Sequence, residues 1–107
     1  MKELIFTYNW NNKLNNKYFT SIRMSELYIP GQEYKIVIKE KGFVLKTLGV
    51  AKILVIKELY LHQINEFIAG LDTGYGVDEC KKIIMKMYPN TDWKQKQIKL
   101  ILFKYVS

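Results

Sequence analysis

Apolar and polar residues alternate in several short segments of the chain, which is the pattern of β-strands with one buried face. The alternation is clearest after the Pro30-Gly31 turn. It places Tyr34, Ile36 and Ile38 on one face and Lys35, Val37 and Lys39 on the other. A glycine-marked turn and a β-branched stretch ending near Glu58 come next, so the sequence predicts two consecutive strands here.

Three other segments also have strand character. They are ELIFTY (residues 3–8), YFTSIRM (residues 18–24) and IKLILFKYV (residues 98–106). The Asn-rich segment WNNKLNNK (residues 10–17) lies between the first two and is too brief for more than a loop or one turn of helix.

Two helices are predicted before the last of these strands. In YLHQINEFIAG (residues 60–70) apolar residues recur at helical spacing, and Gly70 is a suitable C-terminal stop. The recurring positions are Leu61, Ile64, Phe67, Ile68 and Leu71. In GVDECKKIIMKMYP (residues 76–89) an apolar face lies opposite a lysine face, and Pro89 ends the helix. The apolar face is Val77, Cys80, Ile83, Ile84 and Met87, and the lysines are Lys81, Lys82 and Lys86.

Strands followed by helices and a further strand are typical of an α+β domain. We expect a small antiparallel β-barrel with two or three short helices covering one end. A chain of 107 residues, 49% of them hydrophobic, has the material for one core, so residues 1–107 are expected to form a single domain.

Several classes of protein are excluded by what the sequence lacks. No segment approaches the roughly 18 uninterrupted apolar residues of a membrane-spanning helix, and the first residues lack a secretory pattern. We therefore expect a soluble, cytoplasmic protein with no membrane partner. One cysteine, Cys80, cannot form an internal disulfide, and one histidine, His62, leaves no zinc-ligand spacing, so no metal or cofactor is expected. Cys80 is expected in the core and His62 on the surface.

The charge points to an anionic partner. Lysine and arginine number 17 against 10 acidic residues, which gives a net charge of +7. Phosphate backbones attract proteins with such a potential, so RNA is a natural partner. Abundant lysine and asparagine with a single arginine, Arg23, are equally what an AT-rich genome would encode. That composition leaves open a phage or mobile-element protein that binds a host factor.

The single arginine lies in a strand segment with two hydroxyl residues. Alternation places Phe19, Ser21 and Arg23 on one face, and Tyr18, Thr20 and Ile22 on the other. A guanidinium offers a planar fork of donors that suits phosphates, carboxylates and base edges, and a nearby hydroxyl can bind or act as a nucleophile. The alternative is that Arg23 forms a salt bridge at the strand end.

A second candidate site is GLDTGYG (residues 70–76), predicted to connect the two helices. Asp72 follows the expected helix end in a glycine-rich turn with Thr73 and Tyr75, on a mobile connector that can face a cleft. Asp72 can instead be a local hydrogen-bonding cap. Trp10 and Trp93 can stack on bases or pack on the core.

The order of these features resembles that of the ASCH domain, a relative of the RNA-binding PUA fold. The resemblance extends from about Phe6 to Tyr105, and FTSIR, KKIIMKMYP and ILFKY are similar to segments of small bacterial N4-acetylcytidine amidohydrolases. It implies a PUA-like β-barrel with a cleft lined by the FTSIR strand. It also implies binding of RNA or modified nucleosides.

In the amidohydrolase branch a lysine, a threonine and a glutamate remove the acetyl group from the cytosine amine. Aligned through the Ile-Arg pair, the hydroxyl position is Ser21, and the lysine is displaced by one residue to Lys17. Thr20 lies three residues after Lys17, and Asp72 stands in the glutamate region. The candidate catalytic residues are therefore Lys17, Thr20, Ser21 and Asp72, and the candidate ligand-binding residues are Arg23, Tyr75 and Trp10.

Two functions follow from these residues. The favoured one is a binding module that recognises RNA or a modified nucleoside through Arg23 and its neighbours, with salt-sensitive affinity. The alternative is an amidohydrolase in which Lys17 assists Ser21 or Thr20 as nucleophile and Asp72 transfers the proton.

Overall fold

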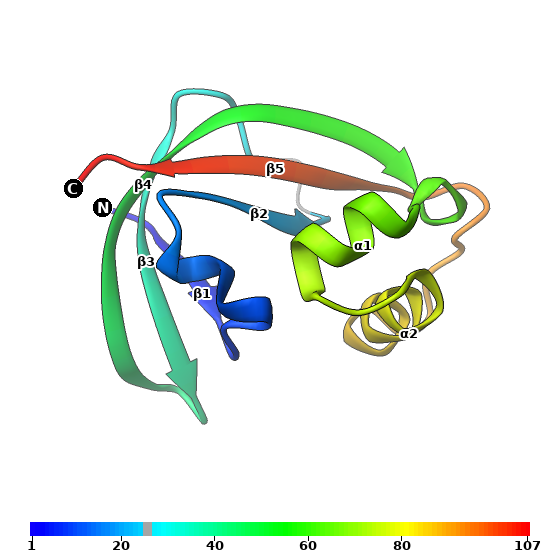
Figure 1. The fold of residues 1–107 in the computed structure, drawn as a ribbon, viewed down its shortest axis with the longest axis horizontal. Coiled ribbons are helices and arrows are strands. Elements are labelled where there is room, and N and C mark those ends of the chain that lie inside the picture. Colours follow the sequence, from blue (N-terminus) through cyan, green and yellow to red (C-terminus); the bar gives the residue numbers. More distant parts are fainter. Residues whose placement is uncertain (25–26) are drawn as a thin grey trace.

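The computed structural model describes residues 1–24 and 27–107, which form an α+β fold around one five-stranded sheet (Figure 1). The strands are β1 (Glu3–Phe6), β2 (Tyr18–Arg23), β3 (Glu33–Glu40), β4 (Phe43–Tyr60) and β5 (Gln97–Tyr105). Their order across the sheet is β1-β3-β4-β5-β2. The α+β class is thus confirmed.

The sheet is mixed and open. β1 runs parallel to β3, whereas the other neighbouring pairs are antiparallel, so the prediction of an all-antiparallel arrangement is wrong at this pair. β1 and β2 are the two edge strands, and no backbone pairing among the described residues closes the sheet between them. A side chain reaches across instead, because Arg23 on β2 donates from Nη2 to the carbonyl oxygen of Ile5 on β1 at 2.9 Å.

The long strand β4 bends so that it serves two partners. Its first part pairs with β3 and its second part with β5, and Figure 1 shows it curving over the sheet. One register shift in the β3–β4 pair lies between Ile36 and Val37. The extra residue at this shift is Leu48 on β4, so β3 itself keeps its alternation. Val37 is nevertheless fully buried, although the alternation predicted it on the polar face, so both faces of β3 are covered at this point.

In the described part of the chain, four short helical segments accompany the sheet. They are the 3-10 helices η1 (Trp10–Asn15) and η2 (Leu61–Gln63) and the α-helices α1 (Glu66–Thr73) and α2 (Val77–Met87). α1 and α2 lie together at one end of the sheet, near the end of β2 (Figure 1). Among the described residues, no helix has both the length and the apolar character needed to cross a membrane.

The first predicted helix is displaced along the chain. α1 begins at Glu66, after Asn65 caps it by accepting a hydrogen bond from the Ile68 N–H at 2.9 Å, and it continues through Gly70. Its C-cap is Gly74, whose φ of 79° is the left-handed conformation that glycine adopts without a Cβ clash. The apolar spacing predicted one helix where the structure has two, because it joined the residues of η2 to those of α1. Phe67, which the spacing placed on the apolar face, is 75% exposed.

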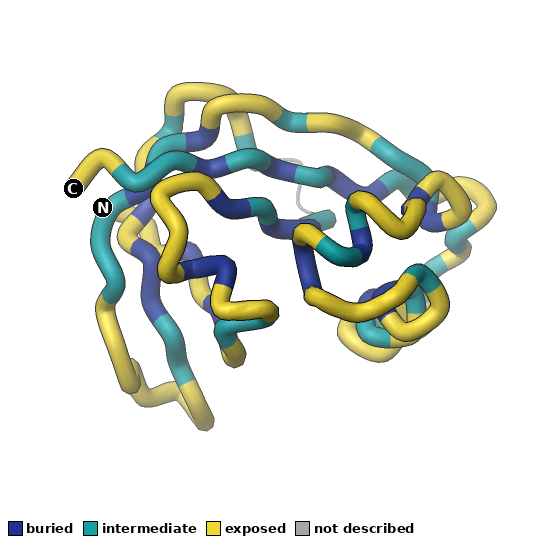
Figure 2. Tube along the Cα trace, in the orientation of Figure 1, coloured by how far each residue is buried: buried dark blue, intermediate teal, exposed yellow. Residues whose placement is uncertain are grey.

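The second predicted helix is confirmed. α2 ends at Met87, before Pro89, and buries Cys80 and Ile84. The core has two clusters, one within the sheet around Phe19 and Phe103 and one between the sheet and the α-helices around Ile98 and Cys80. Figure 2 shows buried positions along the strands and on the segments that face them.

One half-buried phenol connects η1 to β5. Tyr105 donates from its hydroxyl to the carbonyl oxygen of Leu14 at 2.9 Å. Burial raises the pKa of Tyr105 to about 12, above the ordinary value of 10.0. The unfolded chain therefore loses this proton at a lower pH than the folded chain, so the free energy of unfolding falls as the pH rises from about 10 to about 12.

Tyr105→Phe is expected to make this alkaline decline shallower. At neutral pH the substitution should cost roughly 1 kcal/mol, because the Leu14 carbonyl loses its donor. Urea unfolding of both proteins at neutral pH and at alkaline pH measures the two effects. Tyr18→Phe, at an exposed tyrosine of β2, is the matched control and should keep the wild-type decline. An unchanged decline in Tyr105→Phe would contradict the assignment.

Candidate functional site

The Asn-rich segment before β2 buries a lysine. Asn11 and Asn12 both adopt the left-handed conformation, with φ of 55° and 52°, which asparagine tolerates better than most residues. This double turn interrupts η1 and directs Lys13 and Leu14 inward, where they are 4% and 2% exposed. The side-chain oxygen of Asn9 accepts a hydrogen bond from the Leu14 N–H at 2.9 Å.

Lys13 meets Asp72 from the last turn of α1. Lys13 Nζ lies 2.8 Å from Asp72 Oδ1, and both side chains are less than one tenth exposed. Thr20 donates to the same carboxylate oxygen at 2.9 Å. Burial lowers the pKa of Lys13, and the neighbouring Asp72 carboxylate opposes that shift. The three residues form a polar cluster that joins η1, β2 and α1.

Arg23 and Ser21 form a second polar group on β2. Arg23 donates from Nε to Ser21 Oγ at 2.8 Å and from Nη2 to the Ile5 carbonyl, while its third nitrogen, Nη1, has no hydrogen bond to a described residue. The guanidinium carbon lies 4.7 Å from the centre of the Phe6 ring, and Lys13 Nζ lies 5.7 Å from the same ring. Ser21 is 3% exposed, so the orientation of Arg23 is held from within the fold.

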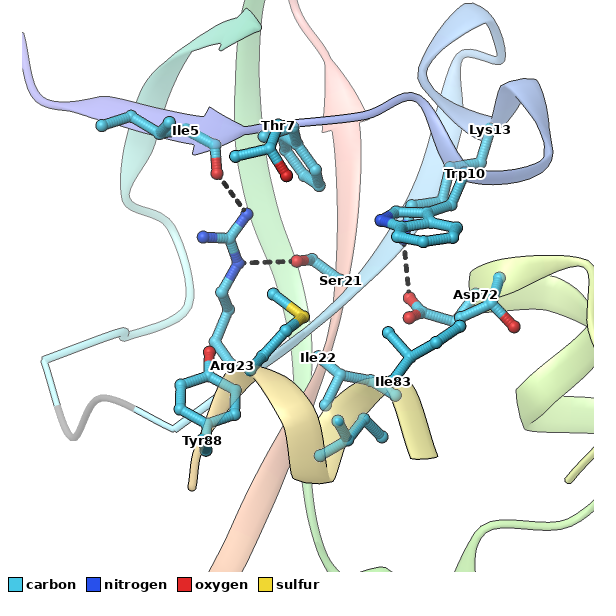
Figure 3. A pocket seen from close by; sticks show the side chains of 14 residues that line it. Ile5, Thr7, Trp10, Lys13, Ser21, Ile22, Arg23, Asp72, Ile83 and Tyr88 are labelled. Atoms are coloured by element: carbon cyan, nitrogen blue, oxygen red, sulfur yellow. Dashed lines mark hydrogen bonds and ion pairs between the residues drawn. The ribbon is translucent and has the colours of Figure 1, made fainter. Parts of the chain in front are cut away.

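The two polar groups line one cleft (Figure 3). The cleft has a volume of about 90 Å³ and lies between β1, β2, η1 and α2. Its polar side chains include Lys13, Ser21, Arg23 and Asp72, and its apolar wall includes Ile22, Ile83 and Met87. Trp10 and Tyr88 add aromatic surface on two sides. The arrangement offers donors and acceptors between apolar walls, which suits a flat, polar-edged ligand.

Four of the residues predicted from the sequence line this cleft, namely Trp10, Ser21, Arg23 and Asp72. Thr20 does not line the cleft but donates a hydrogen bond to Asp72, which does. Tyr75 lies outside the cleft, with its ring centre 6.0 Å from that of Trp10. Lys17 is exposed and does not line the cleft. The lysine that is buried at the cleft is Lys13, which was not predicted because it lies in a segment interpreted as a loop or one turn of helix.

The surroundings of Asp72 also differ from expectation. Asp72 was predicted on a mobile connector, yet it lies within α1 and is 6% exposed. The difference arises because α1 passes through Gly70 and is capped only at Gly74. Asn11 of η1 packs here as well, donating to the Gly70 carbonyl at 3.3 Å. Packing between η1 and α1 therefore brings Lys13 and Asp72 together.

Cys80, His62 and Trp93, the other residues considered in the sequence, do not line the cleft. Cys80 is fully buried as expected, and burial raises the pKa of its thiol. His62 is exposed and stacks on Tyr60. Trp93 packs against the core cluster between the sheet and the α-helices. Among the described residues no three side chains of His, Cys, Asp or Glu are grouped so that they could hold a metal ion.

Comparison with known proteins identifies no relative of the chain. No protein-family model matches it, no curated protein matches its sequence and no solved structure matches its fold.

Proposed function

We propose that the cleft binds a nucleobase of RNA or a modified nucleoside, as expected for an ASCH-type domain with a PUA-like barrel. The observation that supports this proposal is the placement of Arg23 and Ser21 with Lys13 and Asp72 between apolar walls. A nucleobase has flat apolar faces and an edge of hydrogen-bond donors and acceptors. The apolar walls of the cleft suit its faces, and the polar side chains suit its edge.

The size of the cleft limits how a base can enter. Its volume of about 90 Å³ is smaller than the ~150 Å³ of an apolar cavity that encloses a benzene ring. A base would therefore insert its polar edge toward the charged side chains, while the sugar stays outside. The net charge of +7 would add a sequence-independent attraction to phosphates, which weakens as salt is added.

The direct test is titration of the protein with nucleosides and short RNAs, followed by the amide shifts of β2 and α2. Cytidine and N4-acetylcytidine should bind, and Ser21→Ala should reduce their affinity at least about tenfold because Arg23 loses its hydroxyl support. Thr47→Ala removes an exposed hydroxyl from β4 and should bind as the wild type does. Absence of nucleoside and RNA binding by the wild type would overturn the proposal.

The burial of Lys13 favours a second candidate function, hydrolysis of N4-acetylcytidine or a related acylated nucleoside. A lysine with a lowered pKa exchanges its proton more readily near neutral pH than an exposed one. Asp72, 2.8 Å away, can accept the proton of a water molecule that attacks the acetyl carbon. Lys13 would protonate the departing cytosine amine as the carbon–nitrogen bond breaks, and the proton on Asp72 would then return to Lys13.

This candidate is tested by following cytidine release from N4-acetylcytidine chromatographically. Asp72→Asn should lower the rate by at least about 100-fold, because the carboxylate can no longer accept the proton. Comparing Lys13→Ala with Lys17→Ala decides between the buried lysine and the one predicted from the sequence. Absence of cytidine release by the wild type would leave nucleobase binding as the proposed function.

A further inference from the structure

We propose that the ligand is a single-stranded RNA, with one base in the cleft and a neighbouring base stacked on an aromatic cluster beside it. The cluster consists of Tyr8, Trp10 and Tyr75. This inference rests on the proposed nucleobase binding and extends it from a free nucleoside to a nucleotide within a strand.

Trp10 connects the cleft to two further hollows on the same side of the protein. It lines the cleft itself, a polar hollow of about 240 Å³ and a third hollow of about 360 Å³. Tyr75 lines the second and the third hollow as well. A strand with one base in the cleft would therefore lead its next nucleotide over Trp10 into a neighbouring hollow.

The aromatic rings leave surface for that nucleotide. Tyr8 and Trp10 have ring centres 4.8 Å apart, Trp10 and Tyr75 have centres 6.0 Å apart, and both contacts are edge to face. Tyr8 is 57% exposed and Tyr75 is 44% exposed. Neither contact is a parallel stack, so the rings do not cover one another's faces completely. Bases of any sequence stack on such rings.

Polar groups around the rings suit the rest of a nucleotide. The second hollow is lined by Asn9, Asn11 and Asn12. Asn9 is held by hydrogen bonds to Leu14 and Asn15, whereas the side-chain amide of Asn12 can bond to sugar hydroxyls and base edges. The third hollow presents Lys82 from the exposed lysine face of α2, which can approach a phosphate. Glu79 lines the same hollow, so a phosphate would approach it from the side of Lys82.

The experiment compares the affinity of a nucleoside monophosphate with that of a five-nucleotide RNA carrying the same central base. The wild type should bind the RNA about 5- to 150-fold more tightly for each stacked base. A DNA of the same sequence distinguishes recognition of the ribose hydroxyl from stacking alone. Trp10 is left unchanged, because it lines the cleft and its loss would weaken both ligands.

The variants are Tyr8→Ala, Tyr75→Ala and Tyr75→Leu, the last of which keeps apolar bulk without an aromatic face. Substitution of at least one of these tyrosines should reduce the affinity for the RNA to that for the monophosphate, while the affinity for the monophosphate stays the same. Tyr18→Ala, at a tyrosine that is 49% exposed but lines none of these hollows, is the matched control.

The outcomes separate the two proposals. Monophosphate binding with no gain for the RNA, or a gain that all three tyrosine variants keep, overturns the aromatic platform and leaves the nucleobase site intact. Failure of both ligands to bind overturns both proposals.

Discussion

Lys13→Met is expected to lower the free energy of unfolding by about 3 to 5 kcal/mol, the usual cost of removing one partner from a buried ion pair. Methionine keeps the unbranched bulk of lysine but leaves the Asp72 carboxylate buried without its cation. Thr20 would remain as a donor to that carboxylate, and a single hydroxyl does not replace an ammonium group. Urea unfolding at neutral pH measures the effect.

Two further variants make this prediction specific. Lys17→Met removes an exposed lysine four positions along the chain and should change stability by less than about 0.5 kcal/mol. Lys13→Met combined with Asp72→Leu removes both charges and should recover much of the loss, because neither charge is left buried alone. Equal losses in Lys13→Met and Lys17→Met would contradict the buried pair.

Arg23→Lys is expected to reduce both stability and ligand affinity, although the positive charge is kept. The guanidinium reaches Ser21 on its own strand and the Ile5 carbonyl on the opposite edge of the sheet, so it links the two edge strands. The point charge of a lysine lacks the fork that makes both contacts at once. We expect a loss of about 1 to 3 kcal/mol in the free energy of unfolding and about 10- to 100-fold in nucleoside affinity.

Comparison with Arg23→Met shows whether the nucleoside affinity depends on the geometry of the guanidinium or on its charge. If the fork matters, Arg23→Lys and Arg23→Met should lose similar affinity, measured by the same nucleoside titration. If Arg23→Lys binds like the wild type, charge alone suffices, and the role assigned to the guanidinium geometry is wrong.

The local pattern of the sequence predicted those helices and strands whose formation depends on their own residues and not on the segments they pack against. α2 was predicted because its apolar face recurs within the helix itself and its proline stop, Pro89, follows shortly after its end. The alternation in β2 likewise put Ser21 and Arg23 on one face, since side chains of a strand alternate regardless of its neighbours. In β3 alternation did not predict burial, because Val37, on the face predicted to be polar, is fully buried as well.

The polar cluster depended on contacts that no local pattern contains. Lys13 and Asp72 are 59 residues apart, and their pairing requires the double turn at Asn11 and Asn12 to dock on α1. The sequence offers two lysines near β2, and only packing decides that Lys13 is buried while Lys17 faces solvent. The parallel pairing of β1 with β3 could not be predicted from the sequence either, because the residues of a strand do not specify which strand it pairs with.

Local patterns along the chain were therefore enough to predict the α+β composition, the position of most strands and of α2, and the hydroxyl and guanidinium on one face of β2. The tertiary structure decided the order of the strands, the extent of α1, the choice of lysine and the cleft that these contacts enclose. The physical reason is that periodicity and turn chemistry act over a few residues. Burial of a charge, in contrast, depends on which distant segments exclude water from it.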